Sequence, residues 1–305
     1  MLRQTSGGRG IWEEFQFSDS SDVSACDYWI VLNDLPCAQT VVCPPERTIL
    51  FALEAESIFR YPDAFIRQFG TIVTCQKNLV HPRVVNDLTT TFWFLERTFD
   101  ELIALKSTDI QKTRTLSLIT SNKTFSEGHR KRLEFAQALK SRLGEDLDIF
   151  GRGILDFDSK WEVLAPYRFS IVIENTPASL FLTEKMCECF LTYTFPFYIG
   201  CSEAEDIFPP ESFIRLDPED LDRAEEIIRT TLACKGFWEE RLPAMEEARR
   251  RYLYEVQFFP RAVSVLRQLE TLPASGPVPI RLNPHPRIGL MERFIEKVRN
   301  YCRHS

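Results

Sequence analysis

The sequence predicts an α/β protein of two lobes, each built on a parallel sheet. Short apolar runs rich in β-branched residues alternate with amphipathic helical stretches, and a charged stretch at residues 111–114 separates two such series. Runs that are apolar along their whole length, without alternation, are typical of parallel strands covered by helices on both faces. With 305 residues, the chain is long enough to form two hydrophobic cores.

The first series contains three expected strands and one expected helix. The strands are expected at residues 27–32, 48–53 and 70–75, because each is a short apolar run bounded by polar residues. The helix is expected at residues 61–68, with Pro62 in its first turn, where a missing N–H costs nothing.

The second series contains more elements. Strands are expected at residues 115–120, 147–150, 169–173, 197–200 and 213–216. One helix is expected over residues 127–143, and another begins near Thr183; from Pro218 to about Leu269 the chain is mainly helical. Each of the two named helices has one apolar stripe: Phe135, Leu139 and Leu143 in the first, and Met186, Cys189, Phe190 and Tyr193 in the second.

The end of the chain differs from both series. Residues 272–287 hold five prolines and are expected to form an extended linker, which an amphipathic helix follows. We expect this helix to pack back on the first lobe; its basic face could alternatively contact an anionic membrane surface. The predicted domains are therefore residues 1–111, 112–271 and 272–305.

Composition excludes several classes of protein. The net charge of −7 argues against broad nucleic-acid binding, which needs a basic face. No apolar run is long enough to span a membrane, and the first residues lack the apolar stretch of a signal peptide. The nine cysteines and four histidines are scattered, so we expect free thiols in a reducing, cytoplasmic compartment and no bound metal. The Asp-x-Asp triplets at 146–148 and 156–158 are interpreted as loop acids.

The residues best suited to bind a charged ligand follow the expected strand at residues 169–173. Glu174 and Asn175 follow this apolar strand directly, and Thr183-Glu184-Lys185 then opens a helix. Thr183 is expected to cap the helix by accepting a hydrogen bond from a first-turn amide. Free N–H groups at a helix start, together with the ammonium of Lys185, predict a site for a diphosphate.

The same stretch resembles the motifs of the α-1,3/4-fucosyltransferases. Their pattern is close to F-x-x-x-F-E-N-S, then Y-x-T-E-K, then a P-V-x-x-G strand. This chain has the corresponding runs at residues 169–176, 181–185 and 196–200, and a further run at 208–214 that is similar to F-x-P-P-x-S-F-I. The strong resemblance covers roughly residues 115–235 and is loose in the first lobe.

The resemblance implies a GT-B fold, with two facing Rossmann-like lobes and a cleft between them. It also implies GDP-fucose as the donor, a glycan acceptor, inversion at the anomeric carbon and no metal or other cofactor. The first lobe would take the acceptor, and residues 112–271 would bind the donor. Membrane contact would then be peripheral, for a lipid-linked acceptor.

The resemblance also implies roles for single residues. Lys185 and Arg132 would neutralise the departing diphosphate, Glu184 would hold the ribose, and Thr183 would begin the same helix. The remaining donor contacts would come from Glu174 and Asn175 beside the fucose, from Asn122 in a facing loop, and from Phe181, which replaces the tyrosine of the family.

A carboxylate is needed to take the proton of the acceptor hydroxyl. Glu54 directly follows the expected strand at 48–53, and its place resembles that of the acidic residue in the first lobe of the family. Glu56 is the alternative base, and Asp34 is a more distant one. Two other functions stay open: transfer of a different GDP-linked hexose, which Phe181 motivates, and nucleotide or glycan binding without turnover.

Overall fold

The structure, a computed structural model, describes residues 1–89, 92–122 and 127–285. Contacts among the described residues define two units, one of residues 1–89 and 259–285 and the other of the described residues from 92 to 258. The boundaries expected from the sequence were 111/112 and 271/272. Residues 92–111 therefore pack in the second unit, and residues 259–271 pack in the first.

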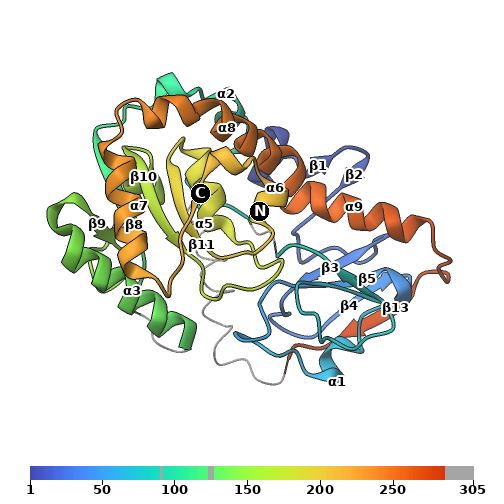
Figure 1. Cartoon of the computed structure of the whole chain (residues 1–305). Helices are drawn as coiled ribbons and strands as arrows, with labels where there is room; N and C mark the ends of the chain where they lie inside the picture. The colour runs from blue at the N-terminus through green and yellow to red at the C-terminus, as the bar shows by residue number, and fades with distance from the viewer. Residues whose placement is uncertain (90–91, 123–126, 286–305) are drawn as a thin grey trace. The chain divides into compact units, whose positions relative to one another are not determined.

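The first unit contains a parallel sheet in the order β3-β5-β6-β7 (Figure 1). The strands at residues 27–32, 48–53 and 70–75 are confirmed as β3 (Trp29–Leu32), β5 (Thr48–Ala52) and β6 (Thr71–Thr74). All residues of β5 and β6 are buried, as expected for central parallel strands. The fourth strand, β7 (Val84–Asn86), is too short to be recognised from its sequence.

The proline-rich segment corrects one expectation. Residues 278–282 are not linker but β13 (Val278–Leu282), which pairs antiparallel with β4 (Gln39–Cys43). Pro279 removes one N–H and is tolerated because β13 is an outer strand of this two-stranded ribbon. Leu282 is buried and belongs to the core of the first unit. The expected last helix, with Arg293, Lys297, Arg299 and Arg303, lies outside the described residues.

The first unit is completed by short elements and one long helix. The expected helix near Pro62 is confirmed but is a single turn, with Pro62 at its N-cap. These elements are the hairpin β1 (Ile11–Trp12) and β2 (Phe15–Gln16), the helices α1 (Asp63–Ile66) and α9 (Phe258–Glu270), and 3₁₀ turns at Leu2–Gln4, Ser6–Gly8 and Pro45–Arg47.

The second unit contains a five-stranded parallel sheet in the order β12-β11-β10-β8-β9. Its strands are β8 (Arg114–Ile119), β9 (Asp148–Phe150), β10 (Tyr167–Ile173), β11 (Phe195–Ile199) and β12 (Ile214–Arg215). The chain starts at β8, moves outward to β9, and then returns to the other side of β8 as β10. The strand order therefore reverses between β8 and β10, and such a switch point opens a crevice at the carboxyl ends of the two strands.

Helices surround this sheet (Figure 1). α3 packs against α7, while α5 packs against α8, β10 and β11. The helices are α2 (Phe99–Ala104), α3 (Glu127–Leu143), α4 (Lys160–Leu164), α5 (Glu184–Leu191), α6 (Ala204–Ile207), α7 (Leu221–Ala233) and α8 (Phe237–Arg251). A π-helical turn at Tyr252–Val256 follows α8, and 3₁₀ turns lie at Ser107–Asp109, Gly144–Asp146 and Pro210–Ser212.

The expected stripe of α3 is confirmed, since Phe135, Leu139 and Leu143 are buried in the core of the second unit. The four residues of the stripe expected for the second helix, Met186, Cys189, Phe190 and Tyr193, are buried too, but burial of α5 is not limited to that stripe. All residues from Met186 to Leu191 are buried, including the carboxylate of Glu188, because other elements cover this helix on more than one side. Tyr193 lies beyond the end of α5, in a turn with a positive φ of 53°.

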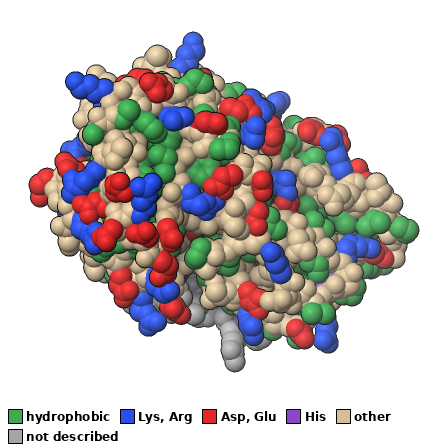
Figure 2. Space-filling model, viewed as in Figure 1, with side chains coloured by type: hydrophobic (Ala, Val, Ile, Leu, Met, Phe, Trp, Pro, Cys, Tyr) green, Lys and Arg blue, Asp and Glu red, His purple; other side chains and the backbone are tan. Residues whose placement is uncertain are grey.

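The surface of the second unit carries paired charges. On α3, Lys131 lies within ion-pair distance of Glu127 and Glu219, and Arg142 contacts Asp222 and Glu225 of α7. Figure 2 shows acidic and basic side chains interspersed on the face in view. Lys131 is therefore an exposed cation that faces surface acids. None of the helices in the described residues is long and apolar enough to cross a membrane.

Candidate functional site

Arg132 lies at the switch point of the second sheet. This α3 residue donates from its Nη1 to the side-chain oxygen of Asn175, directly after the Glu174 that follows β10. Its Nη2 donates to Ser121 Oγ at 3.2 Å, in the loop after β8. One guanidinium therefore joins the segments that follow the carboxyl ends of two neighbouring strands.

The charge of Arg132 has little compensation. The residue is 8% exposed, and none of the described carboxylates forms an ion pair with it. Its Nε is buried without a hydrogen-bond partner among the described groups. Burial lowers the pKa of Arg132, while the nearby charges of Glu174 and Glu184 act in the opposite direction. A buried guanidinium with an unsatisfied donor is favoured energetically by an anion close to it.

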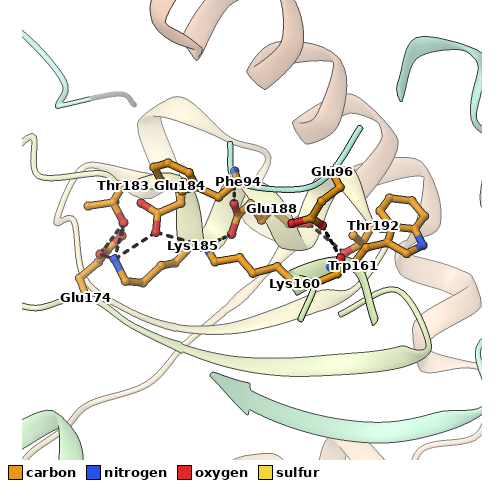
Figure 3. A network of polar contacts seen from close by, with 11 residues as sticks. Phe94, Glu96, Lys160, Trp161, Glu174, Thr183, Glu184, Lys185, Glu188 and Thr192 are labelled. Carbon is orange, nitrogen blue, oxygen red and sulfur yellow. Dashed lines mark hydrogen bonds and ion pairs between the residues drawn. The ribbon is translucent and has the colours of Figure 1, made fainter. Parts of the chain in front are cut away.

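Glu174 lies beneath the start of α5 (Figure 3). Its carboxylate accepts hydrogen bonds from the Thr183 amide at 3.0 Å and from the Thr183 hydroxyl at 2.8 Å, and Lys185 Nζ lies 3.1 Å from its Oε2. The side chain of Glu174 has no exposed surface. Glu174 thus supports Thr183 and Lys185; its expected place beside the sugar stays a prediction.

The hydroxyl of Thr183 does not cap α5 as predicted but bonds to Glu174 and Lys185. Thr183 occupies the N-cap position of α5, but its side chain makes no capping hydrogen bond. The hydroxyl donates to Glu174 and accepts from Lys185 Nζ at 2.8 Å. The expected cap is therefore wrong, because the buried carboxylate below competes for the hydroxyl. The first turn of α5 keeps N–H groups without a side-chain cap, and it adds positive potential near Lys185.

Lys185 is held by two carboxylates. Its Nζ lies 3.1 Å from Glu174 and 3.8 Å from Glu184, and about a quarter of the side chain (24%) is exposed. Burial would lower the pKa of Lys185, but the two carboxylates outweigh burial and raise it. Lys185 is therefore a permanent cation near neutral pH. Within the described residues it makes two hydrogen bonds, so one of its three N–H donors is left for a ligand.

Two further charged residues extend this group, and neither was among the residues predicted for the site. Lys160, the first residue of α4, contacts Glu188 and lies 3.4 Å from Glu184. Glu188 also accepts a hydrogen bond of 2.6 Å from the Phe94 amide. Burial raises the pKa of Glu188 to about 7, against the opposing effect of Lys160. The only signal in the sequence was an acid inside an otherwise apolar helix.

Two glycines allow this packing. At Gly200, a Cβ atom would lie 2.3 Å from Tyr198 Oη and 2.6 Å from Glu174 Cγ, so only glycine lets the end of β11 approach Glu174. Gly153 has a φ of +76°, and a Cβ there would lie 2.2 Å from the side-chain nitrogen of Asn122. Asn122 itself is exposed, and its backbone N–H donates to the carbonyl of Arg152 at 3.2 Å.

Phe181 is placed in the core. It is 1% exposed, so its ring packs within the second unit and offers no surface to a ligand. Asn175 keeps its place beside Arg132, which engages its side-chain oxygen.

The three candidate bases lie in the first unit and differ in their surroundings. Glu54 follows β5 and is partly buried, and its carbonyl accepts a hydrogen bond from Gln76 at 2.8 Å. Glu56 is paired with Arg60 and accepts from Asn78. Asp34 is buried and accepts from the amides of Leu35 and His285, which is a structural role.

The loop between β10 and α5 is tied down by Glu203. The carboxylate accepts from the Ser179 hydroxyl at 2.6 Å, the Leu180 amide at 2.8 Å and the Ser202 hydroxyl at 2.9 Å. Leu180 has a positive φ of 57°, so these bonds also hold an unfavourable backbone conformation. Glu203 thereby fixes the segment that leads into Thr183.

Comparison with known proteins gives a consistent picture. Residues 110–231 match the family model described as glycosyltransferase family 10 (fucosyltransferase), C-terminal part. The α-(1,3)-fucosyltransferase FucT of Helicobacter pylori is 32% identical over 72 residues, which are 23% of this chain and 15% of that relative. A crystal structure of an α1,3-fucosyltransferase with GDP-fucose is similar with a TM-score of 0.51 at 17% identity, over 77% of this chain and 79% of that chain.

These findings confirm the resemblance stated from the motifs. Arg132, Lys160, Glu174, Lys185 and Glu188 all fall inside the matched residues 110–231. The structural likeness, at 17% identity, concerns the fold alone and confirms the two-lobed GT-B type. The described residues contain no group of three or more histidine, cysteine or acidic side chains that could hold a metal ion.

Replacing Glu203 with Gln should weaken the dependence of stability on acid pH. Partial burial would raise the pKa of Glu203, but hydrogen bonds from Ser179 and Leu180 lower it to about 2, below the ordinary value of 4.5. The ionised form therefore stabilises the fold above pH 4.5, and this contribution is lost as the pH falls towards 2. Because solvent screens a partly exposed group, we expect a difference of about 1–2 kcal/mol between the proteins.

The measurement is the free energy of unfolding in urea at several pH values from 7 to 2. The difference between wild type and Glu203→Gln should shrink as the pH falls. Glu211→Gln, at an exposed glutamate nearby, is the control. Parallel pH curves for wild type and Glu203→Gln would contradict the assigned role.

Proposed function

We propose that this chain is a glycosyltransferase that transfers fucose from GDP-fucose to a hydroxyl group of a glycan. The observation that carries the proposal is the buried guanidinium of Arg132 at the switch point between β8 and β10, inside the region that matches the fucosyltransferase family. A nucleoside diphosphate is the leaving group of such a reaction. Its negative charge would balance the guanidinium of Arg132, which has no carboxylate partner among the described residues.

Two cations from different elements support a diphosphate site. Arg132 comes from α3 and Lys185 from the first turn of α5, where the helix start adds further positive potential. At an effective dielectric constant of about 20, one cation about 4 Å from one phosphate charge gains on the order of 4 kcal/mol before desolvation. Since charge builds up on the diphosphate as the sugar leaves, these groups would stabilise the transition state more than the ground state.

The remaining roles are proposed from the same geometry. Glu184 follows Thr183 at the start of α5, and its carboxylate is suited to accept hydrogen bonds from the two ribose hydroxyls. Glu54 of the first unit would take the proton of the acceptor hydroxyl, and attack opposite the leaving diphosphate would invert the anomeric carbon. With two cations on the leaving group, we propose that the reaction needs no metal, so activity should persist in EDTA.

Arg132→Ala should abolish most donor binding and turnover while leaving the fold intact. The guanidinium has no carboxylate partner among the described residues, so its removal leaves no buried acid unpaired. Loss of a charge-assisted contact costs about 1.5–3 kcal/mol, or about 10- to 100-fold in the dissociation constant of GDP. Lys185→Ala should also reduce turnover, and it should destabilise the protein as well because Glu174 loses its counter-ion.

Calorimetric titration with GDP and with UDP, together with melting temperatures, provides the test. The matched control is Lys131→Ala, which removes an exposed cation from the adjacent position of α3 and should leave GDP affinity unchanged. Unaltered GDP binding by Arg132→Ala, or a preference for UDP, would overturn the proposed function.

Glu54→Gln should reduce the rate of transfer strongly while leaving GDP affinity unchanged. A general base contributes about 10²–10⁴-fold to a rate, and the amide cannot accept the proton. Glu56→Gln is the comparison, because that carboxylate is already engaged by Arg60 and Asn78. Rates of transfer and GDP dissociation constants should be measured for both variants; full activity of Glu54→Gln would remove Glu54 from the mechanism.

The alternative donor is another GDP-linked hexose. Phe181 supports this alternative, because it lacks the tyrosine hydroxyl of the family, which could bond to the donor. Its ring is buried. Comparing the hydrolysis of GDP-fucose with that of GDP-mannose separates the two donors. Nucleotide binding without any turnover on either donor would favour a binding module.

A further inference from the structure

Charged side chains form an alternating row along α5 (Figure 3). From one end to the other, the row runs through Glu188, Lys160, Glu184, Lys185 and Glu174. Lys160 is the member that no motif of the sequence indicated and that has no place in the proposed reaction so far. It comes from α4, whereas Glu184, Lys185 and Glu188 belong to α5.

The ammonium of Lys160 is held in place from several sides. Ser159 caps α4 by accepting from the Trp161 amide at 3.1 Å, and its hydroxyl contacts Glu96. The ring of Phe94 lies 5.3 Å from Lys160 Nζ, and the Phe94 amide fixes the carboxylate of Glu188 that Lys160 contacts. Lys160 is therefore an anchored charge, with 19% of its side chain exposed.

This anchored charge determines the surroundings of Glu184. The same oxygen, Glu184 Oε1, lies 3.4 Å from Lys160 Nζ and 3.8 Å from Lys185 Nζ. Lys160 is thus the nearer counter-ion. Without it, the carboxylate of Glu184 would have only Lys185 to pair with among these cations, and that pairing would turn it towards Lys185 and compete with a diphosphate for the same ammonium.

We propose that Lys160 is a positioning residue: by pairing with Glu184, it orients that carboxylate towards the nucleotide ribose and leaves Lys185 available for the diphosphate. The inference rests on the proposed function, because it assigns a ribose and a diphosphate to this site. Glu188 has the complementary task of anchoring Lys160, since its buried carboxylate would otherwise lack a counter-ion.

The test must separate orientation from stability. Lys160→Met alone would leave Glu188 buried and unpaired, and the protein could fail to fold. The test variant is therefore Lys160→Met with Glu188→Gln, which removes both charges of the buried pair and keeps an acceptor for the Phe94 amide. Its control is Lys131→Met with Glu219→Gln, which removes an exposed pair from the same unit.

The readout is the ratio of the dissociation constants for 2′-deoxy-GDP and GDP, measured by calorimetry on the full chain. A protein that merely lost stability would keep this ratio. We expect wild type and the control to bind GDP at least about tenfold more tightly than the deoxy analogue, because a hydrogen bond to a carboxylate is lost. In the Lys160→Met/Glu188→Gln variant, the ratio should fall towards one and GDP affinity should weaken.

An unchanged ratio in that variant would overturn the role of Lys160. Equal affinity of the wild type for the two nucleotides would also overturn it, while leaving the diphosphate site and the proposed transfer reaction in place. Failure of the wild type to bind GDP at all would overturn the proposed function, and this inference with it.

Discussion

The buried positive charge of Arg132 is the constraint around which the second unit is organised. Burying a guanidinium is costly unless its donors are satisfied, and the fold meets this cost by placing Ser121 and Asn175 at the ends of the two strands that flank the switch point. Those residues can lie there only because β8 and β10 are neighbours although β9 lies between them in the chain. The strand order thus brings these two strand ends together, and the guanidinium of Arg132 makes the electrostatic potential there positive.

The carboxylates near Arg132 and Lys185 balance the buried positive charge, so this cluster is stable without a bound anion. Three cations (Arg132, Lys160 and Lys185) and three carboxylates (Glu174, Glu184 and Glu188) share this corner of the unit, so the group is formally neutral. Neutrality overall does not mean that each charge is matched. Lys160 and Lys185 are paired, whereas Arg132 has only neutral partners among the described side chains, and this local imbalance favours an anion.

Much of this arrangement follows from local sequence. The strands at 48–52 and 167–173 are recognisable because a parallel strand buried on both faces is apolar throughout, and α3 because its stripe has a helical period. Several residues of the candidate site could also be recognised in the sequence. They lie at the end of a strand or at the start of a helix: Glu174, Asn175, Thr183 and Lys185. Local sequence was enough wherever a residue's role depends on its immediate neighbours.

Where roles depend on residues distant in the chain, prediction failed. β13 pairs with a strand more than two hundred residues earlier, so its prolines suggested a linker. The hydroxyl of Thr183 bonds to the carboxylate of Glu174, which lies nine residues earlier in the chain. Glu188 can be buried because Phe94 and Lys160, from other parts of the chain, supply it with a hydrogen bond and a counter-ion. The bonds from Thr183 and Lys185 to Glu174 have a consequence of their own. Because one carboxylate at the end of β10 holds both residues, strand and helix cannot shift independently here, and the ammonium of Lys185 stays at a fixed height above the sheet edge.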